Sequence, residues 1–436
     1  MATTGLATPE TMREPSHEST PVSRYAANNS QNPVSDSMIE YAPTEHFPIF
    51  KTGDVFIKTE LVFPPKQWQL HSRVLTRISS WFARSIQQAA NEVKSRTWFA
   101  YTIEEVEGEV QLVQQEATGE HPVIEVLEGG TIGIDVPKKI ENKDPIDPLS
   151  QTDHTTKITL YNQIFGSVYN ILPPIPTTSI TTTLTHCEQL VTLAKALGCI
   201  STHLTSHLNA TLLQHHQPLY KAIKTDPARW LLLALPLKNT SIYTESLIHL
   251  SGAHPCWPWP TKRSTLPPQT RHLIKTKSTH LDHLCTETER SLLLLTIHTP
   301  TGHPVCASEN AQFGTWFVVA TFRDILAREL HTLYASNKAA LKRGMLFRKL
   351  ARGGEDYMGF GEMRRLMLRV MPSAVDSLEE DLEILKGEAA VYVQALVRNE
   401  ALVDVEAEDV GWLTCTVVRG EDIPWVVDEG ESPARV

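Results

Sequence analysis

The sequence lacks the features of a membrane-spanning or disulfide-stapled protein. Its longest purely apolar runs, such as Leu231 to Pro236 and Leu292 to Leu295, fall far short of a bilayer span. The six cysteines are widely spaced, so no cysteine-rich framework is present and reduced thiols are expected. The stretch MATTGLATPETMREPSHEST has no basic region followed by an apolar core, so no secretory signal is expected. We therefore expect a cytoplasmic or nuclear protein without a membrane partner.

An excess of positive charge is also missing. The formal net charge of −10 and the pI near 6.0 provide no overall attraction to nucleic acid or to an anionic membrane. The apolar content of 41% allows a chain of 436 residues to bury more than one core. These values are typical of a soluble protein with at least two domains.

Motifs of known catalytic sites are absent as well. The sequence contains no Gly-x-Ser-x-Gly elbow, no His-Glu-x-x-His pair and no dinucleotide fingerprint after a strand. The glycine-rich stretch GGEDYMGFGEM lacks the Gly-Lys-Ser/Thr ending of a phosphate loop, and its Glu355 and Asp356 would repel a phosphate. We expect a protein that is not an enzyme and that needs no cofactor.

The N-terminal half alternates between strand and helix patterns. Residues 1–45 are rich in small and polar residues and are expected to be a disordered tail. Alternation in GDVFIKTELVF predicts a strand, and Pro64-Pro65 turns the chain into a second strand, WQLHS. The run SRVLTRISSWFARSI has an apolar helical stripe with Ser72 as N-cap, and TWFAYTIEEVEGEVQLV reads as a third strand and its extension.

Residues 107–156 interrupt this pattern with acidic, glycine-containing and proline-containing sequence, and are predicted to be an insertion. Within it, VIEVL and TIGIDV flank a glycine pair and predict a hairpin. Helical periodicity resumes at TLYNQIFGSVYNIL and continues through two helices separated by Gly198, which is placed for a left-handed C-terminal cap.

The rest of the chain is predicted to be mostly helical to about residue 400. Asp226-Pro227 is a helix start, and a further helix is expected from Ser241 as cap to Gly252 as terminator. Longer helices are expected over 269–297, 316–352, 361–371 and 373–399. Residues 401–436 form an acidic segment in which Trp412 and Trp425 lie in short strand-like runs.

Four separated segments together resemble the BTB/POZ domain, an interaction fold. They are Gly53-Asp54-Val55, the run LHSRVL with the later Ser79 and Phe82, the helix YNQIFGSVYN, and the helix LVTLAKALGC. The resemblance covers about residues 46–215 and implies an α/β domain with a three-stranded sheet packed with helices and carrying the insertion. The helical continuation at 216–400 is similar to the region after the BTB domain in a group of fungal BTB-domain proteins.

The resemblance also implies functions. BTB domains form homo-oligomers or hetero-oligomers, and many recruit partners to cullin ubiquitin ligases or to transcriptional complexes. In dimeric members, the strand aspartate and a basic residue next to the histidine line a charged pocket. Asp54 matches the aspartate, but Ser72 follows His71 and the basic Arg73 comes one position later. This departure places the family's dimer pocket in question, and no clear cullin-contact motif is present.

His71 has two interpretations. As a general base it would need a nucleophile or acid within hydrogen-bond reach and a third group to orient it, and the sequence shows no such set. As a structural residue it would be a half-buried imidazole that is hydrogen-bonded to backbone at the junction of strand and helix. We favour the structural interpretation.

Metal binding is suggested by two similar pairs, His254-x-Cys256 and His283-x-Cys285, with further candidates nearby at His280, His303 and Cys306. Residues 280–297 have helical periodicity, however, so side chains two positions apart, such as His283 and Cys285, point in different directions. The sequence therefore predicts no metal site.

A cluster of cations occurs in LKRGMLFRKLARGG, with further arginines at 364, 365 and 369. Such a helix could neutralise phosphates, which gives the alternative function of a nuclear regulator whose basic helix at 341–352 contacts nucleic acid. The cations are interleaved with Leu341, Met345, Leu346 and Leu350, which is typical of an amphipathic helix whose charged face is solvated or paired. We favour that second interpretation.

Two tryptophans, Trp257 and Trp259, stand in a proline-rich loop. They could anchor an interface, but packing on the helical region is the interpretation we favour. The sequence as a whole predicts a non-catalytic scaffold or adaptor that binds other proteins. Its interaction or structural residues are expected to be Asp54, His71, Arg73, Phe82, Trp257 and Trp259.

Overall fold

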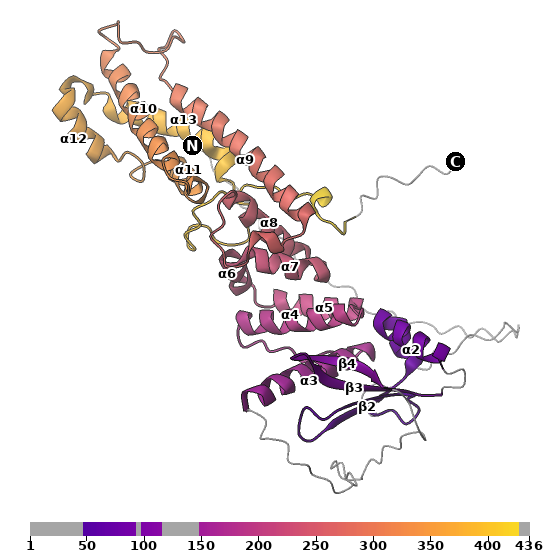
Figure 1. Ribbon diagram of the computed structural model, residues 1–436. Coiled ribbons are helices and arrows are strands. Elements are labelled where there is room, and N and C mark those ends of the chain that lie inside the picture. Colours follow the sequence, from indigo (N-terminus) through magenta and orange to yellow (C-terminus); the bar gives the residue numbers. More distant parts are fainter. Residues whose placement is uncertain (1–46, 93–96, 116–147, 427–436) are drawn as a thin grey trace, which may run out of the picture. The chain divides into compact units, whose positions relative to one another are not determined.

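The computed structural model of the protein describes residues 47–92, 97–115 and 148–426 (Figure 1). The tail expected at 1–45, the hairpin expected around the glycine pair at 129–130 and the last ten residues lie outside the described residues. Within the described ranges, a small sheet with its helices, here called the α/β part, is followed by a helical part, so the predicted α/β-plus-helical architecture is confirmed.

The α/β part contains a mixed sheet in the order β2-β1-β3-β4. Its strands are β1 (Val55–Thr59), β2 (Lys66–Leu70), β3 (Phe99–Val106) and β4 (Glu109–Gln115). β1 is antiparallel to β2, in the register that pairs Val55 with Leu70, and parallel to β3. The predicted hairpin of the first two strands is therefore confirmed.

The sheet has four strands rather than the predicted three. The chain turns back at Glu107 and Gly108, whose φ angles of 54° and 82° make a two-residue loop between β3 and β4. Positive φ at both loop positions suits the twist of the flanking strands. β4 and the start of α3 (Pro148–Val168) lie inside the range 107–156, so the insertion is shorter than predicted and separates β4 from α3.

Helices pack on this sheet around an aromatic centre. Trp68 and Phe165 meet edge to face at 5.6 Å between ring centroids, and Phe82 meets Tyr101 at 5.4 Å. Large apolar side chains buried in this way supply most of the favourable free energy of folding. The helices are α1 (Ser72–Ile78), α2 (Ser80–Glu92), α3, α4 (Ile180–Ala196) and α5 (Thr202–Leu213).

The ends of these helices agree in part with the sequence. Gly198 follows α4 with φ of +60°, which confirms the predicted left-handed cap. The N-cap of α1 is His71 in extended conformation, not the predicted Ser72. Ser72 cannot serve as this cap because it is already the first helical residue and directs its hydroxyl to Asp54.

Three short helices begin the helical part: α6 (Gln217–Thr225), α7 (Pro227–Leu237) and α8 (Thr240–Ala253). The predicted cap Asp226 accepts a hydrogen bond from the backbone N–H of Arg229, as expected. The cap of α8 is Asn239 rather than Ser241, because its side chain reaches the backbone N–H of Ile242 at 2.9 Å. α8 also continues one residue beyond Gly252, the predicted terminator.

The remaining helices are α9 (Pro268–Leu294), α10 (Phe313–Tyr334), α11 (Arg343–Arg352), α12 (Phe360–Val370) and α13 (Leu378–Val397). The single helix predicted over 316–352 is wrong, since the chain leaves α10 after Tyr334 and makes only a 3-10 turn before α11. The hydroxyl of Ser336 accepts from the backbone N–H of Lys338, which offers the chain an alternative to continued helix. None of the described helices has the length and apolarity needed to cross a bilayer.

Residues 398–426, here called the C-terminal segment, lack regular structure apart from a 3-10 turn at Gly420–Asp422. The described part of this segment contains no strand around Trp412 or Trp425, contrary to the prediction. Its apolar residues Val403, Val410 and Leu413 are nevertheless almost fully buried. The segment holds its place through side chains of the helices, which supply the hydrogen bonds that a sheet would otherwise give.

Candidate interaction site

Asp54 and Ser72 join the first strand region to α1. The Asp54 carboxylate accepts from the backbone N–H of Ser72 at 2.7 Å and from its hydroxyl at 2.5 Å. A carboxylate is favourable here because the first turn of a helix has backbone N–H groups without helical partners. The charge of Asp54 is thus engaged within the chain by Ser72.

His71 is buried beside the same junction. Its Nε2 lies 2.9 Å from the hydroxyl of Thr52, and its Nδ1 lies 3.2 Å from the hydroxyl of Tyr169, which also accepts from the His71 backbone N–H. Burial lowers the pKa of His71 below its ordinary value, and the negative charge of Asp54 partly opposes this. The imidazole at the junction of β2 and α1 thus contacts the side-chain hydroxyls of Thr52, before β1, and Tyr169, after α3, where the sequence predicted hydrogen bonds to backbone.

The other predicted residues separate into three places. Arg73 is exposed on α1, while Phe82 is 1% exposed in the aromatic centre. Trp257 and Trp259 meet edge to face at 5.4 Å, and Trp259 also contacts Trp412 at 5.6 Å. Both tryptophans pack against the core, in line with the interpretation we favoured, so this loop does not present an open aromatic patch.

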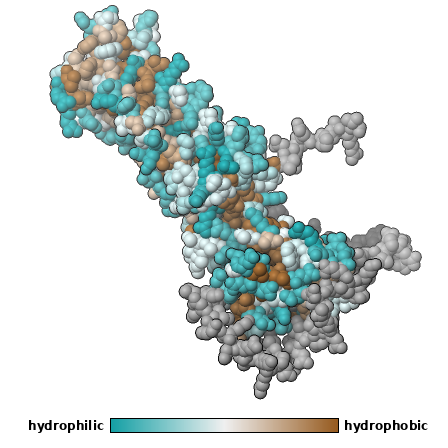
Figure 2. Space-filling view, in the orientation of Figure 1, coloured by the Kyte–Doolittle hydropathy of each residue, from teal (hydrophilic) through white to brown (hydrophobic). Residues whose placement is uncertain are grey.

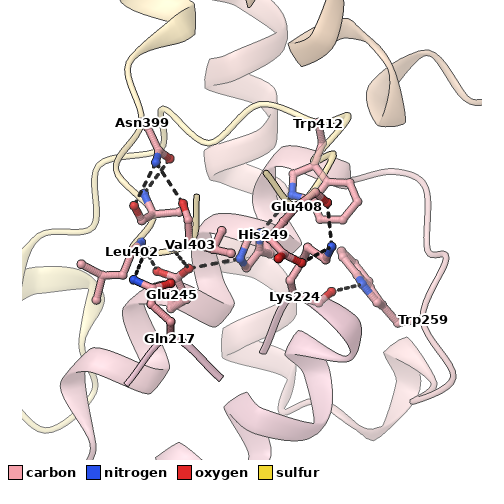
Figure 3. A network of polar contacts seen from close by, with 11 residues as sticks. Gln217, Lys224, Glu245, His249, Trp259, Asn399, Leu402, Val403, Glu408 and Trp412 are labelled. Carbon is pink, nitrogen blue, oxygen red and sulfur yellow. Dashed lines mark hydrogen bonds and ion pairs between the residues drawn. The ribbon is translucent and has the colours of Figure 1, made fainter. Parts of the chain in front are cut away.

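A buried polar network holds the C-terminal segment on α6 and α8 (Figure 3). Glu245 is 1% exposed, and its carboxylate accepts from the backbone N–H groups of Leu402 and Val403 at 2.7 and 3.1 Å. His249, one turn further along α8, places Nε2 3.3 Å from Glu245 and accepts at Nδ1 from the indole N–H of Trp412. A buried carboxyl group thus lies beside a buried imidazole, but the C-terminal segment supplies hydrogen-bond donors to both of them.

The arginines of the predicted basic helix are engaged in the same way. Arg343 is 4% exposed and pairs with Asp282. Arg348 donates to the backbone carbonyl of Val410 and lies 3.1 Å from Glu406, which also pairs with Arg352. Arg348 and Arg352 thus hold the C-terminal segment on α11, whereas Arg343 holds α9.

The predicted metal candidates do not converge among the residues that the structure describes. His283 is exposed and contacts Glu287, whereas Cys285 is buried in the helical core. No group of three or more His, Cys, Asp and Glu side chains in the described ranges is placed to hold an ion. Burial raises the pKa of the Cys285 thiol to about 12.

A groove between β4, α3 and α4 is a feature that the sequence did not predict. Its volume is about 600 Å³, and its lining combines apolar side chains with polar residues at the margin. The apolar lining includes Trp81, Val110, Leu112, Leu160, Tyr161, Leu193, Ala196 and Leu197. Figure 2 shows hydrophobic surface bordered by hydrophilic residues on the α/β part in this view.

Sequence patterns did not reveal the groove because one of its walls and the start of a second fall inside the range 107–156 assigned to the insertion. Val110 and Leu112 belong to β4, and Asp153 and Thr156 belong to the first half of α3. The Glu107-Gly108 pair between two alternating runs was the available signal for the hairpin that forms one wall. The third wall, on α4, requires knowledge of how the helix packs on the sheet.

The chain was compared with protein-family models, with curated proteins and with solved structures, and none of them matches it. The geometry described above is therefore the basis for any functional assignment. Among the described residues, the groove and the acidic β3–β4 hairpin beside it are open to solvent.

Proposed function

We propose that this chain is a non-catalytic scaffold or adaptor that binds other proteins through its BTB-like α/β part. The observation that carries the proposal is the apolar groove between β4, α3 and α4. Concave apolar surfaces with polar margins are the usual docking places for ligands and for partner segments. Oligomerisation and recruitment to a larger assembly, such as a cullin ubiquitin ligase, are the functions that the resemblance adds.

The polar side chains elsewhere support docking over chemistry. His71 is held by Thr52 and Tyr169, and the Glu245–His249 pair is covered by the C-terminal segment. A general base has to reach a substrate proton, and these imidazoles already have protein partners. The proposal also places docking at the groove rather than at Asp54, because that carboxylate is engaged by Ser72.

The alternative of a nucleic-acid-binding regulator has less support. Phosphate contacts need cations that are free to approach the backbone of the nucleic acid. On α11, Arg343 is buried and Arg348 and Arg352 pair with Glu406. The helix holds the C-terminal segment, and this gives its positive charge a role inside the protein.

The full-length protein tests the proposal in two measurements. Light scattering after size-exclusion chromatography gives its oligomeric state, and quantitative affinity purification compares partners of the wild type with those of Ala196→Arg. Ala196 is exposed on α4 and lines the groove, while Thr181, on the same helix, is exposed and does not. We expect partners that Ala196→Arg loses and Thr181→Arg keeps. A monomer whose partners are the same for all three proteins would contradict the proposal.

A further inference from the structure

The groove has an acidic entrance. The β3–β4 hairpin carries Glu104, Glu105, Glu107 and Glu109 within the six residues EEVEGE, and Asp153 of α3 lies on the groove wall. Lys157 is the cation among the lining residues, and it lies 3.0 Å from Asp153 and 3.8 Å from Glu109. One lysine cannot balance these carboxylates, so negative charge is in excess at this end.

The other charges near the groove do not reverse this excess. His154 of α3 lies 3.2 Å from Glu105, and Lys157 has a raised pKa because Asp153, Glu109 and Glu105 surround it. At the α4 side, Glu188 is held by Arg229 at 2.7 Å, so that carboxylate is already balanced. The unbalanced part is the hairpin end, where Glu109 and Asp153 have side-chain exposures of 74% and 62%.

The edge of β4 is not open to another strand at the groove. The hydroxyl of Tyr161 on α3 donates to the backbone carbonyl of Val110 at 3.5 Å. The same hydroxyl also hydrogen-bonds to the backbone of Leu112. An added strand would need these outward-facing backbone groups. Tyr161 therefore disfavours strand addition, whereas the walls formed by α3 and α4 suit a helix laid between them.

We propose that this groove binds an amphipathic helix of a partner protein, with an apolar face toward Trp81 and Leu193 and lysine or arginine residues toward the β3–β4 hairpin. The inference rests on the proposed function and names the chemistry of its partner. The apolar face supplies the contact area, and the basic residues face Glu109 and Asp153, whose charge raises the association rate and selects against acidic partners.

The probes are two synthetic helical peptides with the same leucine face. One carries lysines beside that face and the other carries glutamates at the same positions. Fluorescence anisotropy with the full-length protein measures binding of each. We expect the lysine peptide to bind about tenfold more tightly or better, with an affinity that falls as salt is raised.

Matched variants locate the binding. Ala196→Arg should weaken binding of the lysine peptide about tenfold or more, because a large charged side chain fills the groove. Glu109→Gln with Asp153→Asn should weaken it severalfold and reduce its salt dependence. Thr181→Arg and Glu383→Gln, on exposed positions of α4 and α13, should leave it unchanged. Circular dichroism of each variant checks that the fold is retained.

Equal binding of the two peptides, or wild-type binding by Ala196→Arg, would overturn the helix assignment. The outcome is separable from that of the proposed function. If natural partners are lost with Ala196→Arg while neither peptide binds, the scaffold function stands and the inferred partner chemistry is wrong. If the lysine peptide binds in the groove while natural partners do not depend on it, the function fails at this site.

Discussion

Gly252 on α8 and Leu413 in the C-terminal segment touch backbone to backbone: a Cβ atom at Gly252 would overlap the carbonyl oxygen of Leu413. Two further glycines make such contacts, since Gly344 of α11 abuts Trp412 of the segment and Gly411 of the segment abuts Leu341. These contacts join the C-terminal segment to α8 on one side and α11 on the other. A side chain at such a position forces the backbones apart.

Replacing Gly252 with alanine should therefore destabilise the protein. We expect a loss of about 2 kcal/mol or more in the free energy of unfolding, because neither backbone can yield without moving α8 or the C-terminal segment. Chemical denaturation followed by circular dichroism measures it. Gly387→Ala is the matched control, since a Cβ at Gly387 on the exposed face of α13 meets no atom. That control should gain roughly 0.5 to 1 kcal/mol; equal effects would contradict the close-approach argument.

Glu245→Gln should release the first part of the C-terminal segment. The buried carboxylate accepts from two backbone N–H groups, and an amide would place its NH₂ against one of them. We expect a loss of about 3 kcal/mol in the free energy of unfolding. Limited proteolysis should show faster cleavage near 399–410. Glu383→Gln, an exposed change on α13, serves as the control and should alter neither measurement.

Arg348→Ala separates a structural role for α11 from a nucleic-acid contact. The guanidinium donates to the carbonyl of Val410 and contacts Glu406, so we expect a loss of about 1 to 3 kcal/mol in the free energy of unfolding. Arg364→Ala removes an exposed cation of α12 and should be near neutral. Salt-dependent retention on a nucleic-acid column is the second measurement. Strong retention that Arg348→Ala abolishes without loss of stability would favour the regulator alternative.

Local signals in the sequence predicted part of the fold. Asp226 as cap, Gly198 as left-handed terminator and the hairpin of β1 and β2 depend on neighbouring residues, and the structure confirms all three. The Glu107-Gly108 turn was equally local, yet the acidic composition around it suggested a loop. Amino-acid composition indicates whether a segment is solvated, whereas the turn depends on the φ angles of Glu107 and Gly108.

The C-terminal segment and the groove were beyond sequence reasoning for a physical reason. Glu245 binds backbone N–H groups of Leu402 and Val403, which are the same in every residue and leave no mark in the sequence. Arg348 looked like part of a solvated basic face because its partner carbonyl belongs to Val410, far along the chain. The groove depends on the distance between α3 and α4, which is set by packing of many side chains at once.

Acidification should destabilise the protein through histidines that are buried or half-buried. Burial lowers the pKa of His71, His186 and His254 below the ordinary value of 6.5. A folded state with a lowered histidine pKa binds protons less readily than the unfolded chain. The contribution of these histidines to the free energy of unfolding is therefore fully present above pH 6.5, and it is lost as the pH falls below that value.

His71→Gln tests the contribution of one site. The glutamine cannot become charged, so the free energy of unfolding of this variant should fall less steeply between pH 7 and pH 5 than that of the wild type, whatever its stability at pH 8. His203→Gln, at an exposed position of α5, should keep the wild-type slope. Glu289 and Asp381, whose burial raises their pKa, act in the opposite direction but equally in all three proteins. Parallel pH profiles for His71→Gln and the wild type would show that the imidazole at the junction of β2 and α1 titrates as it does in the unfolded chain.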